Sequence, residues 1–185
     1  SIKKLKNDFS LLSPISNIKN YGFFKKNEKI LKNSLFKVDY VYGFAILMNK
    51  IKIKNIGMFD ENIFLYNEEI DLCKRLRFEN HKIYIDRNAK VTHLAAKSSN
   101  IGFEYEKCRN WHWMWSQVYL TKKYSNNFLD YLKFTILLIK QLLKIIFYII
   151  LFDKKQIINK SMRFSGTLNS LLGKSSWYRP KFNFD

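Results

Sequence analysis

The segment 128–152, FLDYLKFTILLIKQLLKIIFYIILF, limits the possible folds of this chain more than any other. Within it, residues 134–152 approach the length of a membrane span, which needs about 20 apolar residues. Lys140 and Lys144 interrupt the run, and a spanning helix resists such charges. On a helix, Lys133, Lys140 and Lys144 fall on one narrow face. The pattern therefore predicts an amphipathic helix with a lysine-bearing side.

Two arrangements fit this helix. It can lie in a membrane interface, with its apolar side in the lipid and its lysines among the phosphates. It can instead pack on the rest of the chain or on a partner subunit. The membrane arrangement also predicts an interfacial anchor formed by Trp111, Trp113, Trp115, Tyr119, Lys122, Lys123 and Tyr124. We expect the membrane arrangement, on the inner, cytoplasmic face of the cell membrane.

The charge of the chain is strongly positive and unevenly distributed. There are 33 Lys and Arg residues against 15 Asp and Glu, a net charge of +18. Residues 1–58 and 107–185 are cationic, whereas residues 59–106 hold 7 basic and 9 acidic side chains. Cationic flanks suit an anionic partner such as phospholipid, nucleic acid or a phosphorylated substrate. An AT-rich genome also produces lysine-rich proteins, so charge alone does not select the partner.

The remaining composition indicates a folded intracellular protein. A hydrophobic content of 47% excludes a disordered chain. Cys73 and Cys108 stand alone in the sequence, which favours a reducing compartment. The segment 1–6 has no apolar core of a signal peptide and no initiator Met, so we expect a fragment or a processed product.

Strand-like and helix-like segments alternate along the chain, which predicts an α/β fold. Gly43 lies inside one apolar strand and marks a bend or a close backbone approach. A loop is expected over 16–37 and a turn over 57–61. The predicted strands are 9–15, 38–48, 82–85 and 90–94, and the predicted helices are 68–78, 104–124 and 128–152.

Five of the 15 carboxylates crowd into twelve residues, at Asp60, Glu61, Glu68, Glu69 and Asp71. On a helix from residue 68, Glu69 falls in the apolar arc of Leu72, Cys73 and Leu76, whereas Glu68 and Asp71 point towards the polar side. Partial burial beside like charges raises the pKa of a carboxylate, as a general base requires. The alternative is a solvated first helical turn, capped by Asn67, whose acids complement the helix dipole.

His93 is a second candidate site residue, because it ends a predicted strand. A histidine in that place can bind a metal or a phosphate group. A lone histidine can also be a structural residue, so its position alone leaves all three roles open.

Four blocks occur in order along the chain: VDYVYGFAILM at 38–48, GMFDENIFLYNEEIDLCKRL at 57–76, KIYI at 82–85 and VTHLAAKSS at 91–99. Together they resemble the C-terminal half of family 2 glycosyltransferases, in particular the rhamnosyltransferase-like members that build bacterial surface polysaccharides. The resemblance covers about residues 9–124. It implies the C-terminal half of a GT-A fold over 1–124, followed by a basic, amphipathic helical tail over 125–185.

The resemblance also implies a reaction. Glu69 matches the catalytic base of an inverting transferase, which deprotonates an acceptor hydroxyl for attack on the anomeric carbon of a nucleotide-sugar. The acceptor would be a glycan or a lipid-linked glycan, and nucleic acid is not an expected partner. The other matching positions are Glu68 and Asp71 for acceptor hydroxyls or helix order, Asp39 and Gly43 on the acceptor side, and His93 for a divalent metal.

The sequence departs from the family in two ways. Glu69 stands where Asp is usual and carries the carboxylate one methylene further. No Asp-x-Asp occurs in the sequence, and no βαβ unit precedes residue 9. We therefore expect the nucleotide-binding half to be missing, the isolated chain to be inactive, and a divalent metal, Mg or Mn, to be held mainly by that half.

Two other functions compete with the transferase. A basic, aromatic-rich domain can bind polyanions, such as nucleic acid or acidic polysaccharide, without catalysis. The chain can also be a structural subunit on a membrane surface, in which the acidic cluster is only a helix cap.

Overall fold

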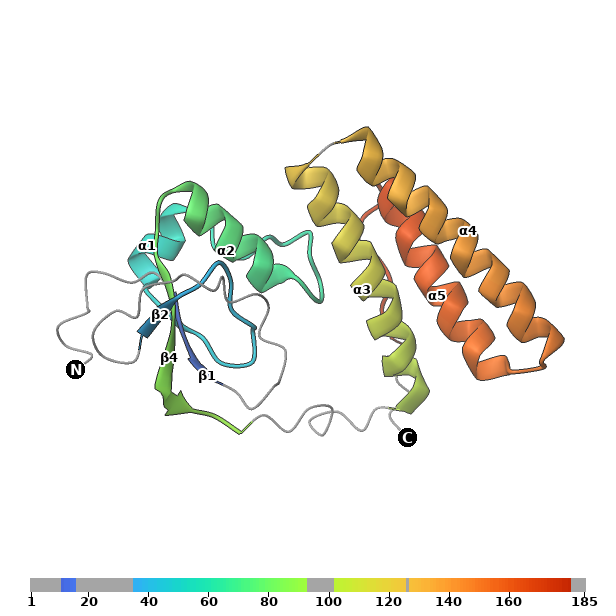
Figure 1. Ribbon diagram of the computed structural model, residues 1–185, viewed down its shortest axis with the longest axis horizontal. Helices are drawn as coiled ribbons and strands as arrows, with labels where there is room; N and C mark the ends of the chain where they lie inside the picture. Colours follow the sequence, from blue (N-terminus) through green and yellow to red (C-terminus); the bar gives the residue numbers. More distant parts are fainter. Residues whose placement is uncertain (1–10, 16–34, 93–101, 126, 181–185) are drawn as a thin grey trace. The chain divides into compact units, whose positions relative to one another are not determined.

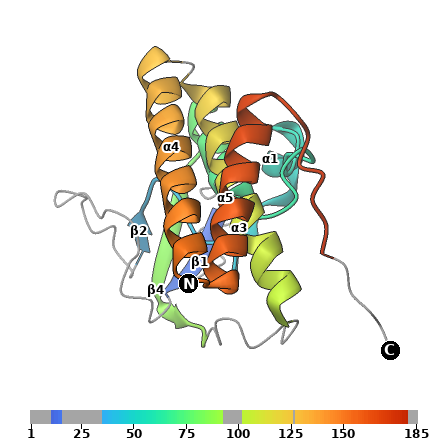
Figure 2. The same ribbon diagram turned by 90° about the vertical axis from the view of Figure 1, so that its right-hand side faces the viewer.

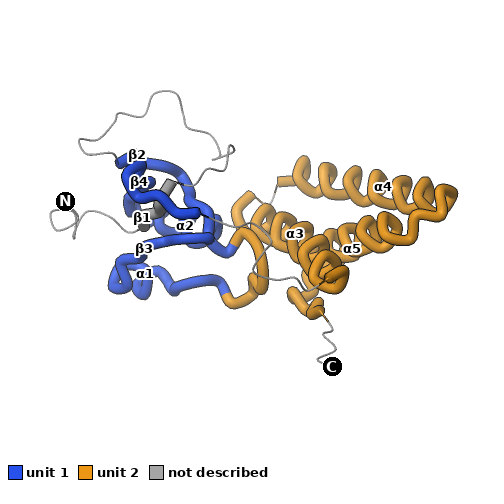
Figure 3. Tube along the Cα trace, turned by 90° about the horizontal axis from the view of Figure 1, so that it is seen from below, with its two compact units in different colours: residues 1–60, 68–98 blue, residues 61–67, 99–185 orange. Residues whose placement is uncertain are grey.

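The computed structural model describes residues 11–15, 35–92, 102–125 and 127–180. Contacts divide the chain into two compact units, which Figure 3 colours separately. The sheet unit comprises residues 1–60 and 68–98, and the helical unit comprises residues 61–67 and 99–185. This division groups the segment from residue 102 to 124 with the C-terminal helices. The chain combines helices with a small sheet, so the α/β expectation is confirmed at that coarse level.

The sheet unit contains four strands in the order β2-β4-β1-β3. Strand β4 pairs in parallel with β1 and antiparallel with β2, and β3 pairs antiparallel with β1. Two helices, α1 and α2, complete the unit (Figure 1). The elements are β1 (Leu11–Ile15), β2 (Leu35–Lys37), β3 (Leu47–Met48), α1 (Lys50–Asn55), α2 (Glu68–Phe78) and β4 (Ile83–Lys90).

The core of the sheet unit joins one face of α2 to one face of β4. Leu72, Cys73 and Leu76 of α2 have no solvent-exposed surface. They pack with Ile83 and Ile85, which share a face of β4 because side chains alternate along a strand. This packing fixes the rotation of α2 and so determines which of its acidic residues face inward.

The predicted strand over 38–48 is largely wrong. Val38 still donates its N–H to the carbonyl of Ile83 at 3.0 Å, but a turn at Gly43 diverts the chain, and only β3 is strand. The two strands predicted over 82–94 form one strand, β4, up to Lys90, and residues 93 and 94 lie outside the described part. The turn over 57–61 is confirmed.

Helix α1 was not expected, because its sequence KIKIKN alternates as a strand would. Asn49 begins it, since the side-chain oxygen accepts the N–H of Lys52 at 3.3 Å. Ile53 is the buried residue of the helix and anchors it to the core. Capping and one buried contact therefore override the alternating pattern.

The helical unit contains α3 (Gly102–Tyr124), α4 (Phe128–Ile150) and α5 (Lys154–Leu171). Helix α5 packs against both α3 and α4, as Figures 1 and 2 show. Gly166 permits the close approach of α5 to α3, because a Cβ there would lie 2.3 Å from the backbone oxygen of Trp111. The long helices over 104–124 and 128–152 are thus confirmed, whereas α5 was expected only as part of a helical tail.

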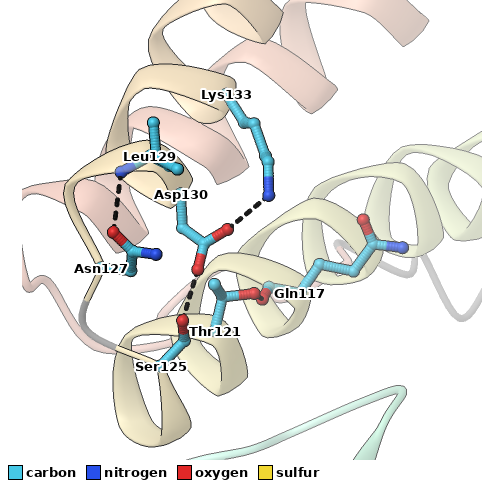
Figure 4. A network of polar contacts seen from close by, with 7 residues as sticks. All are labelled: Gln117, Thr121, Ser125, Asn127, Leu129, Asp130 and Lys133. Carbon is cyan, nitrogen blue, oxygen red and sulfur yellow. Dashed lines mark hydrogen bonds and ion pairs between the residues drawn. The ribbon is translucent and has the colours of Figure 1, made fainter.

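Polar contacts fix the connection between α3 and α4 (Figure 4). The side-chain oxygen of Asn127 caps α4 by accepting the N–H of Leu129 at 3.2 Å. Asp130 accepts a hydrogen bond from the hydroxyl of Ser125 at the end of α3 and pairs with Lys133 at 2.8 Å. One predicted interfacial lysine, Lys133, is therefore also part of this connection.

The predicted aromatic anchor on α3 is only partly available at the surface. Trp111 and Trp115 are 0% and 3% exposed, because they face α5 and the C-terminal segment and form the core of the helical unit. The prediction that they lie in a membrane interface is therefore wrong. Trp113, on the opposite side of the helix, is 42% exposed. In the described part of the chain, no helix combines the length and apolar character needed to cross a membrane.

Candidate functional site

The chain enters α2 through two residues in the left-handed conformation. Tyr66 and Asn67 have φ angles of 66° and 67°. Such angles are uncommon for residues other than glycine, and strain of this kind often accompanies functional sites. Asn67 is buried and donates its amide to the hydroxyl of Ser116 at 2.9 Å. Its backbone is not in the extended conformation typical of an N-cap, so the expected capping by Asn67 is not observed.

Glu69 lies on the inward side of α2, in the arc that the sequence predicted. Burial, followed by the charge of Glu68, raises the pKa of the Glu69 carboxyl to about 7. Backbone hydrogen bonds from Glu69 itself and from Gly43 oppose this rise. A Cβ on Gly43 would stand 3.8 Å from the carboxyl carbon of Glu69. The backbone of Gly43 therefore lies against the Glu69 carboxylate, at a distance where a Cβ would make an ordinary contact.

Glu68 supplies a second carboxylate at the start of α2. Its Oε2 atom is buried and has no hydrogen-bond partner among the described residues. A buried carboxylate oxygen without a donor is costly, and a bound hydroxyl group would relieve that cost. The expectation that Glu68 points to the solvated side is therefore wrong for this oxygen atom, and the atom is placed to accept a hydrogen bond.

Asp71 does not face the polar side, so that prediction is wrong. Its side chain has no exposed surface and pairs with Nε of Arg75 at 2.8 Å. Arg75 also donates to the backbone oxygens of Ile56, at 2.6 Å, and of Met58. The loop after α1 thus covers this side of α2, which the helical periodicity could not reveal. Arg75, which the sequence analysis did not single out, makes Asp71 a structural residue.

Two other predicted site residues, Asp39 and His93, are not brought to Glu69 by the described structure. The side chain of Asp39 is half-exposed and pairs with Arg77 at 3.3 Å. His93 lies outside the described residues. The structure therefore brings together Glu69, Glu68 and Gly43 and assigns Asp71 and Asp39 to ion pairs with α2.

The described residues around Glu69 do not supply a ligand set for a divalent metal. Within the described ranges, no group of three or more His, Cys, Asp or Glu side chains gathers at a possible metal position. A hard divalent cation takes several oxygen ligands, and Asp71 is already engaged by Arg75.

Glu69 and Glu68 together can perform proton transfer. A carboxyl group with a pKa of about 7 is present in both protonation states at neutral pH, which suits a general base. The buried Oε2 of Glu68 offers an adjacent acceptor for a substrate hydroxyl. In comparisons with family models, curated proteins and solved structures, nothing matches the chain.

Proposed function

We propose that the chain is the acceptor-side half of an inverting glycosyltransferase of family 2 type with a GT-A fold. Glu69 takes the proton from an acceptor hydroxyl, and that oxygen attacks the anomeric carbon of a nucleotide-sugar. The observation that carries the proposal is the inward-facing position of the Glu69 carboxyl against Gly43, where burial raises its pKa to about 7. The resemblance of the blocks over 38–99 supports the reaction class.

The other residues orient the acceptor in this proposal. The free oxygen of Glu68 accepts a hydrogen bond from a second acceptor hydroxyl, and its charge keeps Glu69 basic. Gly43 leaves room beside the Glu69 carboxylate, where a side chain would compete with the acceptor. The sequence has no Asp-x-Asp, so this proposal assigns the binding of the donor diphosphate to another part of the protein and expects the chain alone to be inactive.

The test uses the full-length protein encoded by the gene that contains this sequence. Transfer from labelled nucleotide-sugars to a membrane extract of the same cells is compared for the wild type, Glu69→Gln and Glu79→Gln. Glu79 lies just beyond α2, is exposed, and serves as the matched control. Glu69→Gln should lower transfer by about 100-fold or more, because the amide cannot accept the proton. Transfer at the wild-type rate by Glu69→Gln would refute the proposal.

We also propose that α4 rests on an anionic membrane surface at the cytoplasmic face. One side of α4 packs on α5, and an arc of about 160° on its other side is apolar and open to solvent. Thr135 interrupts the arc, but its hydroxyl is satisfied by the backbone oxygen of Tyr131 at 3.0 Å. The most exposed aliphatic side chains of the helix, at 52% to 68%, are Leu129, Ile139, Leu143, Ile149 and Ile150.

Charge selects lipid as the occupant of this face. Lys133, Lys140 and Lys144 are exposed along one edge of the apolar arc. An apolar face bordered by cations is typical of helices that lie at the surface of anionic membranes. A protein partner with a matching apolar groove is the other outcome. It would leave the chain unbound to vesicles of pure lipid.

A further inference from the structure

The helical unit contains a cavity of its own. Its volume is about 410 Å³, and Tyr66, Glu106, Arg109, Asn110, Trp113 and Arg163 line it. These residues come from α3, from α5 and from the segment before α2, and all belong to one compact unit. The volume falls within the range of small-molecule sites.

Two guanidinium groups give the cavity unused hydrogen-bond donors. Arg163 donates from Nε to the side-chain oxygen of Asn110 at 2.9 Å, and Arg109 donates from Nε to the hydroxyl of Tyr66. Within the described ranges, the terminal nitrogens of both arginines have no hydrogen-bond partner. Each arginine is therefore held through Nε while its terminal N–H groups remain available to a ligand.

The carboxylate in the cavity wall is already neutralised. Glu106 accepts the amide of Asn159 at 2.8 Å through one oxygen, and its other oxygen pairs with Lys155 at 3.2 Å. The cavity is therefore cationic in spite of Glu106, and it favours an anion with several oxygen atoms.

Hydrogen bonds between α3 and α5 hold the wall in place before any ligand binds. The amide of Asn110 donates to the backbone oxygen of Glu106 at 3.0 Å and to the side-chain oxygen of Asn159 at 3.1 Å. Asn159 is 6% exposed, so this bridge is shielded from water. Such preorganisation lowers the entropy cost of binding.

An aromatic surface adjoins the arginines. Trp113 is 42% exposed, although tryptophan usually buries most of its ring, and its ring centroid lies 5.4 Å from that of Tyr66 in an edge-on arrangement. The flat indole face offers apolar contact to the C–H face of a sugar ring. A cavity with two free guanidinium forks beside an exposed indole therefore combines recognition of phosphate with recognition of a ring.

We infer that this cavity binds a sugar phosphate, in which Arg109 and Arg163 bind the phosphate oxygens and Trp113 stacks on the sugar ring. This inference rests on the proposed function and identifies the acceptor as a phosphorylated glycan. Tyr66, which forms part of the cavity wall, precedes the proposed base Glu69 by three residues in the chain.

The test measures binding to the 185-residue chain by calorimetry with glucose 1-phosphate, glucose and inorganic phosphate as probes. Glucose 1-phosphate should bind more tightly than phosphate, and glucose should not bind measurably. Arg163→Gln and Arg109→Gln should each weaken binding by about tenfold, because each removes one charge-assisted contact. Arg87→Gln, an exposed arginine on β4, is the matched control and should bind as the wild type does.

Other results would overturn the inference. Equal weakening by Arg87→Gln would mean general attraction to a basic protein, and equal affinity for phosphate and glucose 1-phosphate would mean an anion site without sugar recognition. Competition for the cavity then separates two sources of the ligand. One source is soluble glucose 1-phosphate, and the other is vesicles that carry a polyprenyl glucosyl phosphate. Competition by either source supports the cavity, and competition by neither refutes it.

The inference and the proposed function fail in different ways. Glu69→Gln should bind glucose 1-phosphate as the wild type does while losing transfer in the full-length protein. Loss of transfer without any binding of glucose 1-phosphate would leave the base in place and remove the cavity from the acceptor site. Normal binding together with normal transfer by Glu69→Gln would keep the cavity and remove Glu69 as the base.

Discussion

The two units bury their titratable groups to different effect. In the sheet unit, burial raises the pKa of Glu69 to about 7, and in the helical unit, burial lowers the pKa of His112 to about 4. Both shifts have the same first cause, because burial disfavours the charged form of each group. At neutral pH, however, His112 is uncharged, whereas Glu69 is present in both forms. A shifted pKa therefore indicates catalysis only when it moves the group towards the working pH.

The hydrogen bonds of His112 and Glu68 can be compared in the same way. His112 is fully buried and donates from Nε2 to the backbone oxygen of Tyr178 at 2.7 Å, which ties the C-terminal segment to α3. Glu68 leaves a buried carboxylate oxygen without a donor in the described part of the chain. His112 holds the C-terminal segment through Nε2, whereas its Nδ1, like Oε2 of Glu68, is buried without a hydrogen-bond partner among the described residues.

Loss of the ion pair between Asp71 and Arg75 should have the largest effect on stability. Asp71→Ala leaves the Arg75 guanidinium, with a side chain 19% exposed, without its carboxylate partner. We expect the free energy of unfolding of the sheet unit to fall by about 3–5 kcal/mol. Hydrogen exchange of the α2 amides, followed by mass spectrometry, measures this loss.

All four tryptophans lie between residues 111 and 177, so their fluorescence reports on the helical unit. That fluorescence should unfold at the wild-type urea concentration in Asp71→Ala. Arg77→Ala is the control, because its ion pair with Asp39 is exposed and contributes little. Equal effects of Asp71→Ala and Arg77→Ala would contradict a structural role for Asp71.

The difference between Asp71 and Glu69 shows how far the sequence could be interpreted. Helical periodicity placed α2 and the inward direction of Glu69 correctly, because both depend on contacts a few residues apart. It failed for Asp71, because the loop that covers this residue comes from before α2 and is held through Arg75. The cavity was equally hidden, since Arg109 and Arg163 are 54 residues apart and meet only when α5 packs on α3.

Strand prediction failed for a similar reason. The apolar run over 38–48 has the composition of a buried strand, but the turn at Gly43 directs the backbone towards Glu69. A glycine inside an apolar run was the available signal, and it indicated a close approach without naming the partner. Long helices were predictable because their pattern repeats over many turns, whereas this turn contacts Glu69, a residue distant in the sequence.

Acid should destabilise the helical unit through His112. The folded pKa of about 4 lies below the ordinary value of 6.5, so the unfolded chain binds the proton more readily between these values. Stability is then complete above pH 6.5 and falls as the pH is lowered towards 4, by about 3 kcal/mol in total. Urea unfolding followed by tryptophan fluorescence at several pH values measures the slope.

His112→Gln should remove most of this slope while keeping a donor for the oxygen of Tyr178. His81→Gln, in the sheet unit, is the control and should leave the fluorescence-detected slope unchanged. A helical unit whose stability does not change between pH 6.5 and 4 would contradict the neutral, buried state of His112.

Glu69 should give a pH dependence of opposite sign in the sheet unit. Its folded pKa of about 7 lies above the ordinary value of 4.5, so its contribution is complete below 4.5 and is lost as the pH rises to about 7. Glu69→Gln should therefore match the wild type at pH 4 and exceed its stability at pH 8 by about 1–3 kcal/mol. Hydrogen exchange of the α2 amides at both pH values distinguishes this outcome from a mutant that is less stable at pH 8.

The smallest expected effect concerns the lysine edge of α4. Lys140→Gln and Lys144→Gln should each weaken binding to phosphatidylglycerol vesicles by about fivefold, since a lysine near an anionic surface contributes about 1 kcal/mol. Lys82→Gln, exposed in the sheet unit, is the matched control and should cosediment with vesicles as the wild type does. Equal loss in all three variants would mean that the net charge of +18, and not α4, attracts the chain to lipid. Phosphatidylcholine vesicles complete the comparison, because binding that persists there depends on the apolar arc of α4 alone.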